Sequence, residues 1–148
     1  SQLDRFLMRI ELGYPEPDQE KILLAGADRR ALLTTLQPVL TPAQLIVAQA
    51  QVERIHAAAS IIDYVHAVLM FTRSDNRFLH GLSPRAGLGL LRAAKAWALL
   101  DGRDFVLPED VQRVLPTVVP HRLVSGDDGN PLGHAELAAS ILEAVPVR

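Results

Sequence analysis

The sequence contains no cysteine, so disulfide bonds and thiolate metal sites are excluded at once. A chain without cysteine fits the reducing cytoplasm, and we expect a cytoplasmic location. Aromatic residues are also scarce, at 5% of 148 residues, whereas apolar residues as a whole make up 49%. Because leucine, alanine and valine supply most of the apolar residues, the composition favours helices packed through aliphatic side chains over a sheet rich in β-branched and aromatic residues.

A strong excess of charge of either sign is missing as well. The net charge is −2, with both signs distributed along the chain, so we expect no electrostatic binding of nucleic acid. Arg, Asp or His interrupts each apolar run before it reaches the roughly 18 residues of a membrane span, so we expect no membrane insertion. The chain begins at Ser1, within a patterned segment and without a signal peptide, and we expect it to be a piece of a longer protein.

The first forty residues have three parts. Residues 6–12 alternate imperfectly between apolar and charged side chains and stop at Gly13, which predicts a short strand. Pro17 suits the first position of a helix that should end near Gly26. Residues 27–40 are mixed in character and predict an ordered connector. Because an isolated strand is unstable, residues 6–12 should belong to a sheet whose other strands lie outside this chain.

The remaining residues have the spacing of several amphipathic helices. Thr41 and Ser83 are each followed by proline, and each should cap the helix that begins there. Residues 126–131 have the composition of a loop, and Pro116 and Pro120 should limit the helix before it. The expected helices begin at or near Pro42, Ser60, Pro84, Pro108 and Leu137. The predicted fold is therefore mainly α, a small helical bundle preceded by a short strand stub.

The patterns typical of a self-contained catalytic site are absent from this sequence. It has no G-x-x-x-x-G-K-[ST] phosphate loop. Gly87-Leu88-Gly89 falls inside an expected helix and not between a strand and a helix, so it predicts helix packing. Ser83 has no base in a nucleophile motif and suits an N-cap. The histidines are scattered, and His56 and His66 lack the i, i+4 spacing of a metal pair, so we expect no metal site.

Arg85 is the residue whose position is least explained by helix chemistry. It follows Pro84 in the first turn of a helix, where a cation faces the positive end of the dipole at a cost of about 0.3–1 kcal/mol. Free amides at the same helix end suit an anion, so Arg85 predicts a phosphate contact, with Arg92 on roughly the same face. The alternative is a surface arginine paired with a carboxylate. For Arg5, beside Asp4, such a solvated pair is the simpler interpretation.

Two motifs resemble those of MoxR-type AAA+ ATPases. Residues 2–15, QLDRFLMRIELGYP, resemble the end of the ATPase core in that family. Residues 82–86, LSPRA, and the Ala/Leu-rich stretch that leads into residues 100–106, LDGRDFV, resemble its helical lid. Residues 108–111, PEDV, and 120–123, PHRL, continue the match. The resemblance covers most of the chain in the family's order.

The resemblance implies a division of the chain and a role for each of two arginines. Residues 1–26 would be the C-terminal edge of the AAA+ core, residues 27–40 a connector and residues 41–148 the helical lid domain. Arg5 would be the arginine finger, reaching in trans the γ-phosphate bound by the neighbouring subunit of a hexameric ring. Arg85 would be sensor 2, contacting phosphates held by its own subunit. A guanidinium in either place neutralises charge as the γ-phosphoryl group leaves.

The resemblance also implies cofactors and partners. The family's phosphate loop, acidic metal-binding motif and sensor 1 residue lie upstream of these motifs, and this sequence contains none of them. The complete protein would bind ATP with Mg²⁺ and hydrolyse it, whereas this chain alone should hold no cofactor and be inactive. Implied partners are the other subunits of the ring, von Willebrand factor A domain proteins and client proteins that are remodelled or matured in a chaperone-like way.

Two other classes of protein are compatible with a small helical bundle. A helical protein-interaction module, or adaptor, with no nucleotide role accounts for the bundle, but not for the placement of Arg85 or for a strand without partners. A helix-turn-helix DNA-binding protein accounts for several short helices. The slightly acidic charge and the lack of a basic face argue against the second class.

Overall fold

The computed structural model describes residues 2–26, 33–125 and 133–147 of the chain. Its helices and strands follow one another in the order α1 (Pro17–Ala25), α3 (Pro42–Arg54), α4 (Ala59–Ser74), β1 (Phe78–His80), α5 (Pro84–Leu100), α6 (Pro108–Val118), β2 (Val124–Ser125) and α7 (His134–Ala144), with two short 3₁₀ helices, η1 (Gln2–Arg5) and η2 (Pro120–Arg122). The predicted fold class, mainly α with a small helical bundle, is confirmed. None of the described helices is both long and apolar enough to cross a membrane.

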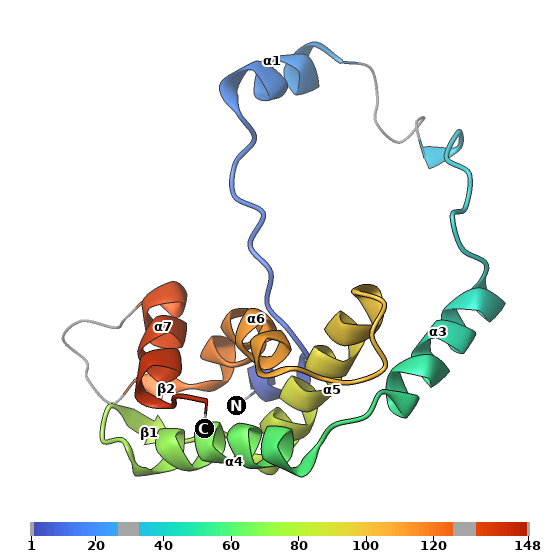
Figure 1. The fold of residues 1–148 in the computed structure, drawn as a ribbon. Coiled ribbons are helices and arrows are strands. Elements are labelled where there is room, and N and C mark those ends of the chain that lie inside the picture. The colour runs from blue at the N-terminus through green and yellow to red at the C-terminus, as the bar shows by residue number, and fades with distance from the viewer. Residues whose placement is uncertain (1, 27–32, 126–132, 148) are drawn as a thin grey trace.

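The bundle consists of α4, α5, α6 and α7, with α5 packed between α4 and α6 (Figure 1). Small residues on the buried face of α5 let its neighbours approach closely. A Cβ added to Gly87 would lie 3.0 Å from the Leu69 side chain of α4, so the predicted helix-packing role of this glycine is confirmed. The core is aliphatic, as the composition predicted. Its most completely buried large side chains are Leu82, Leu90, Leu115, Ile141, Val68 and Val111.

A short antiparallel strand pair, which the sequence did not predict, joins two distant connections. Phe78 of β1 pairs with Ser125 of β2, and His80 pairs with Val124. Strands of three and two residues are too short to show an alternating pattern. The pair therefore joins the connection between α4 and α5 to the segment that follows η2.

Residues 6–12, predicted to be a strand of a sheet whose other strands lie outside this chain, form no strand within the described residues. The segment is extended, but it forms no ladder with any strand in the described part of the chain. The amide of Arg9 donates a hydrogen bond to the carbonyl of Thr117 in α6 at 2.8 Å. An extended segment becomes a strand only when a neighbour supplies the matching donors and acceptors, and here the neighbour is a helix.

Most predicted helix positions are confirmed, with shifts at three of the ends. Helix α4 begins at Ala59, one residue early, and α7 begins at His134, three residues before the predicted Leu137. Helix α6 continues through Pro116 to Val118, since a proline in the last turn removes a single hydrogen bond while the buried apolar face of the helix keeps its packing. The predicted loop at 126–131, and residues 27–32 of the connector, lie outside the described residues.

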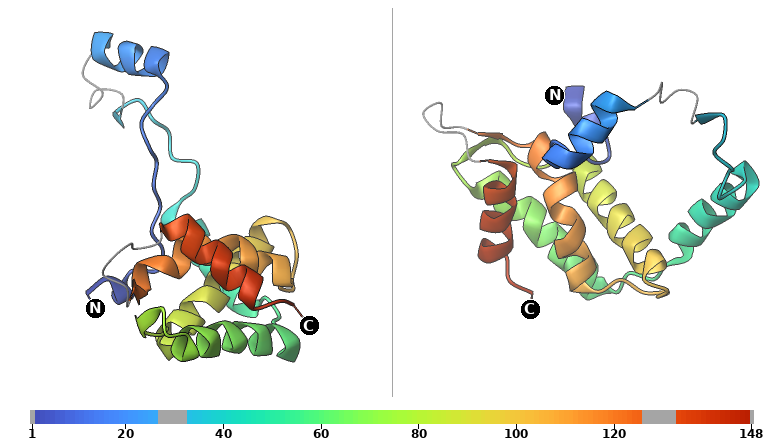
Figure 2. Two further views of the ribbon diagram at one scale, coloured as in Figure 1. Left: turned by 90° about the vertical axis from the view of Figure 1, so that its left-hand side faces the viewer. Right: turned by 90° about the horizontal axis from the view of Figure 1, so that it is seen from above.

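Helix α1 lies apart from the bundle, and α3 contacts the bundle through α5. In Figures 1 and 2, α1 stands at the end of the long extended segment that precedes it, and none of its residues is buried. Leu24 of α1 is 82% exposed, and Ile46 of α3 is 65% exposed. Helix α3 contacts α5 near its C-terminal end, where Ile55 is buried. Two helices therefore present apolar side chains that this chain does not cover.

Candidate functional site

The first turn of α5 is formed by a cap and a proline, as predicted. Ser83 has an extended backbone, and its Oγ accepts a hydrogen bond from the amide of Ala86 at 3.2 Å. Pro84 occupies the first helical position, where its missing N–H removes no intrahelical bond. Arg85 comes next and is exposed. Its charge thus lies at the positive end of the α5 dipole, where an anion is favoured and a cation is not.

Arg85 lines a shallow depression of about 210 Å³, which we call the arginine depression. Four of its lining side chains are arginines, and one, Asp4, is a carboxylate. The arginines come from three separate parts of the chain and are Arg5, Arg85, Arg92 and Arg122, while Leu7, Leu88 and Gly89 complete the lining. The structure therefore brings both candidate residues of the sequence, Arg5 and Arg85, into one strongly positive site.

The four arginines differ in what they already contact. Arg92 pairs with Glu53 at 2.9 Å, with both side chains more than 60% exposed, so this pair is weakly held. Arg122 is buried and pairs with Asp4. Arg5 stacks on Phe6, with its guanidinium carbon 5.1 Å from the ring centroid. Among the described residues, Arg85 has no hydrogen bond or ion pair, so the alternative of a carboxylate partner finds no support there.

Asp4 does not pair with Arg5, contrary to the simpler interpretation of the sequence. Its Oδ1 accepts a hydrogen bond from Arg122 Nη1 at 3.2 Å, and its Oδ2 accepts one from Ser83 Oγ at 3.4 Å. The guanidinium of Arg5 is thereby left exposed in the arginine depression. Burial lowers the pKa of Arg122, Asp4 opposes that effect, and the charge of Arg85 lowers the pKa further. Arginine stays protonated under these conditions, so the depression keeps its positive charge.

Arg122 is the residue of this site to which sequence reasoning gave no role. It stands in PHRL at residues 120–123, which carried part of the family resemblance, but nothing local separates it from a surface arginine. Its carboxylate partner lies 118 positions earlier in the chain. An apolar helix followed by two basic residues is only a weak sequence signal of a functional site. The folded structure is needed to show that Arg122 pairs with Asp4.

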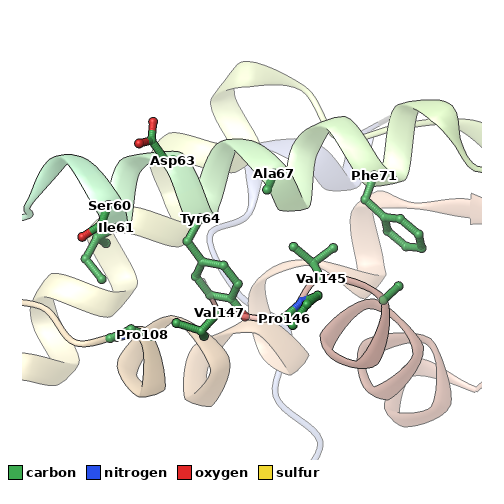
Figure 3. A pocket seen from close by; sticks show the side chains of 11 residues that line it. Ser60, Ile61, Asp63, Tyr64, Ala67, Phe71, Pro108, Val145, Pro146 and Val147 are labelled. Carbon is green, nitrogen blue, oxygen red and sulfur yellow. The ribbon is translucent and has the colours of Figure 1, made fainter.

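A larger groove of about 560 Å³ lies between α4 and the segment that follows α7 (Figure 3). Tyr64 and Phe71 project from α4 toward residues 145–147, whereas Asp63 points away from them (Figure 3). None of the described residues that line this groove is Lys or Arg, so this lining does not suit a phosphate. The described residues also contain no group of three or more His, Cys, Asp or Glu side chains placed to hold a metal ion. A magnesium site does not fit this part of the chain.

A known protein family matches the part of the chain that contains Arg85 and Arg122. The AAA lid domain family matches residues 70–145, which is more than half of the chain. The chain belongs to the AAA lid domain family. The matched region of this AAA lid runs from the end of α4 through α5 and α6 to the residue after α7, and so includes Arg85 and Arg122.

Relatives of the AAA lid include proteins of the MoxR type. The chain is 36% identical over 135 residues to "Chaperone MoxR1" of Mycobacterium tuberculosis, an alignment that covers 84% of this chain and 35% of the relative. It is also 36% identical over 124 residues to the uncharacterised protein YeaC of Bacillus subtilis, covering 84% of this chain and 39% of YeaC. The resemblance to MoxR-type AAA+ ATPases is thus confirmed, and the chain spans between a third and two fifths of these relatives.

The arrangement of elements also occurs in a solved structure. A crystal structure of a putative ATPase from Cytophaga hutchinsonii superposes with a TM-score of 0.83 at 24% identity, covering 99% of this chain and 48% of that one. At this identity the likeness shows a shared fold. Since the superposition covers nearly the whole chain, the shared fold includes α1 and α3 as well as the bundle.

Proposed function

We propose that this chain is the lid region of a longer MoxR-type AAA+ ATPase. In the complete protein it couples ATP binding and hydrolysis in a ring to chaperone-like remodelling or maturation of client proteins. The match to the AAA lid family and the greater length of the MoxR-type relatives support this proposal. The observation that carries it is Arg85, an exposed arginine without a partner among the described residues, at the α5 N-terminus and inside the arginine depression.

Arg85 is proposed to act as sensor 2. Its guanidinium and the α5 amides offer donors to phosphate oxygens, and Arg92 adds a second cation that an exposed, weakly held pair with Glu53 leaves available. Bound ATP supplies the γ-phosphoryl group, whose transfer to water is the reaction. Because α4 and α6 pack against α5, a contact that moves the first turn of α5 moves the bundle with it. The lid angle would report the nucleotide state in this way.

Arg5 is proposed to be the arginine finger that acts on the neighbouring subunit's nucleotide. Its exposure and its freedom from Asp4 suit a residue that completes a site formed with another chain. Residues 1–26 and 27–40 are assigned to the core edge and the connector, and the uncovered apolar side chains of α1 support this division. Mg²⁺ would be held by residues outside this chain. Ring subunits, von Willebrand factor A domain proteins, client proteins and a cytoplasmic location belong to the same proposal.

The test of the sensor 2 role is Arg85→Ala in the complete ATPase. Removing a preorganised charge next to the transferring phosphoryl group should lower the rate of ATP hydrolysis by about 100-fold or more. Arg113→Ala is the matched control, because Arg113 is an exposed arginine that stacks on Trp97 at 5.3 Å, outside the arginine depression. Steady-state hydrolysis of both variants is measured with ATP at saturation.

An Arg85→Ala rate equal to that of the control would remove the sensor 2 assignment. The adaptor alternative would then gain, since it assigns Arg85 no function. It makes a separate prediction, that the 148-residue chain captures a client protein without any ATPase core. Failure to bind the clients of the complete protein would argue against the adaptor.

A further inference from the structure

The N-terminal segment, residues 4–9, is held against the bundle by a buried arginine, Arg122, and by Arg9, whose amide donates to the carbonyl of Thr117. The Arg122 side chain is only 3% exposed. Its Nη2 donates to the carbonyl of Phe6 at 2.6 Å and to that of Leu7 at 3.1 Å, while Nη1 donates to Asp4 Oδ1 at 3.2 Å. A guanidinium withdrawn from water this far is tolerated only where such acceptors surround it. All three acceptors come from the segment that carries Arg5.

Further contacts near Arg122 join residues 4–7 of this segment to α5 and η2. Asp4 also accepts a hydrogen bond from the hydroxyl of Ser83, the N-cap of α5. His121 contacts the carbonyl of Phe6 through Nε2 at 3.1 Å. The segment crosses α5 at Gly89, where an added Cβ would lie 3.3 Å from the Leu7 side chain and 3.5 Å from Arg122 Nη2. The absence of a side chain at Gly89 permits this close crossing.

These contacts connect Arg5 and Arg85, the two arginines to which we assign roles in ATP hydrolysis. Arg5 lies between Asp4 and Phe6, and Arg122 holds both of those residues. Arg85 lies two residues after Ser83, whose hydroxyl is bonded to Asp4. A displacement of the first turn of α5 would therefore act on Asp4, and through it on the backbone that carries Arg5.

We propose that Arg122 is a positioning residue that latches residues 4–9 to the first turn of α5, so that Arg5 and Arg85 move as one unit. The consequence of this latch for catalysis rests on the proposed function. A change at the nucleotide sensed by Arg85 is passed, within one subunit, to the finger that serves the next site. Arg122 acts here through the segment that it holds, because Nη1 donates to Asp4 and Nη2 donates to two carbonyls, while its buried Nε has no hydrogen-bond partner among the described residues.

The latch is tested first on the 148-residue chain, without nucleotide. Because the chain has no cysteine, Ile10→Cys and Leu100→Cys create the only two thiols for nitroxide labels, and these positions are 69% and 81% exposed. The distribution of label distances by pulsed electron spin resonance should be narrow in the otherwise unchanged chain. It should broaden in Asp4→Asn and Arg122→Gln, and less in Arg122→Lys, which keeps the charge but not the fork of donors. Asp63→Asn, an exposed carboxylate of α4, is the control.

Two outcomes overturn the latch. One is a distribution in Asp4→Asn that matches the control, and the other is an Arg122→Gln chain that melts cooperatively with an unchanged distribution. Asp4→Asn keeps the test decisive if Arg122→Gln fails to fold, because the Asp4 side chain is 29% exposed and lies outside the core. Circular dichroism during heating identifies which variants retain the bundle.

A second arm separates this inference from the proposed function. In the complete ATPase, Asp4→Asn should lower kcat about tenfold through misplacement of Arg5, with KM for ATP changed less than about threefold. If Arg85→Ala leaves hydrolysis intact, the proposed function fails, while the label distances still decide the latch. If Arg85→Ala abolishes hydrolysis and the Asp4→Asn kcat matches that of Asp63→Asn, the coupling role of the latch fails alone.

Discussion

Asp110 stabilises the start of α6, where the N-cap residue, Leu107, has no side-chain acceptor for the first-turn amides. The Asp110 Oδ2 accepts a hydrogen bond from the Leu107 amide at 2.7 Å. Arg103 donates to both carboxylate oxygens, at 2.6 and 2.7 Å. Burial by itself would raise the pKa of Asp110, but the hydrogen bonds from Arg103 and Leu107 outweigh it and lower the pKa below 3.8.

A carboxylate with a lowered pKa in the folded state makes stability depend on pH. Its contribution is fully present above the unfolded value of about 3.9 and is lost as pH falls through the folded pKa. Asp110→Asn should therefore lower the free energy of unfolding by about 1–3 kcal/mol at pH 7, and by less at pH 3, where part of the contribution of the carboxylate is already lost. Urea unfolding at both pH values measures the two losses.

The neighbouring Asp101 supplies a matched control for Asp110. It also pairs with Arg103, at 3.1 Å, but its side chain is 51% exposed. Asp101→Asn should change the free energy of unfolding by less than about 1 kcal/mol at either pH, because solvent screens the pair. Equal losses from Asp110→Asn at pH 7 and pH 3 would contradict the account of Asp110.

At the scale of elements, two helices with confirmed caps differ in how much they bury. The Thr41 hydroxyl caps α3 by accepting from the Gln44 amide at 3.3 Å, and Ser83 caps α5. No residue of α3 is buried, whereas α5 lies at the centre of the bundle. Ser83→Ala should therefore reduce the free energy of global unfolding by about 1 kcal/mol, and Thr41→Ala should instead fray α3 locally.

Hydrogen exchange and urea unfolding together distinguish these two effects. In Thr41→Ala, exchange should accelerate in the amides of α3 while the urea midpoint of the bundle stays the same. In Ser83→Ala the midpoint should fall and the amides of α4, α5 and α6 should exchange faster together. A midpoint lowered equally by both substitutions would mean that α3 unfolds as part of the bundle.

The elements that were predicted well from the sequence are those determined by residues close to one another in the chain. Caps and prolines at Thr41 and Ser83 fix helix starts through neighbouring residues, and the spacing of leucine and valine fixes the buried faces. Residues 6–12 have a plausible local pattern for a strand, yet a strand requires a partner that local sequence does not contain. For the same reason β1 and β2, which are defined by each other, were not predicted.

The site follows the same division between local and distant causes. Arg85 was found because it breaks a local rule of helix termini, and Arg92 because it lies on nearly the same face seven residues later. Arg5 was selected by family resemblance alone. The pairing of Asp4 with Arg122 joins residues 118 positions apart, and no local pattern in either segment predicts it.

At the scale of the whole molecule, the exposed apolar side chains of α1 and α3 agree with a lid that packs against a larger ATPase core. Leu24 of α1 and Ile46 of α3 are 82% and 65% exposed, a poor arrangement for an isolated domain. We propose that the ATPase core covers these side chains in the complete protein. The rest of the molecule, from α4 to α7, has its own continuous core, which suits the proposal that it moves as a unit.

How Arg5 acts depends on the arrangement of subunits in the ring that we propose for the complete protein. Arg5 and Arg85 line one depression of one chain, which allows both to contact the same phosphates, whereas the proposed finger role assigns Arg5 to the neighbouring subunit's site. Mixing two inactive variants of the complete ATPase separates these possibilities. One variant carries Arg5→Ala, and the other has an intact Arg5 but a disabled phosphate loop.

If Arg5 acts in trans, some interfaces of a mixed ring combine an intact phosphate loop with a neighbour's Arg5, and hydrolysis should return. With random mixing at equal concentrations, about one quarter of the interfaces have that composition, so the recovered rate should approach one quarter of the normal rate, provided that interfaces act independently and the finger is worth its usual 10³–10⁵-fold. If Arg5 acts within its own subunit, every site in the mixed ring lacks one required group. Rings shown to be mixed by differential labelling would then stay inactive, and the finger assignment would have to be replaced by joint binding of one nucleotide by Arg5 and Arg85.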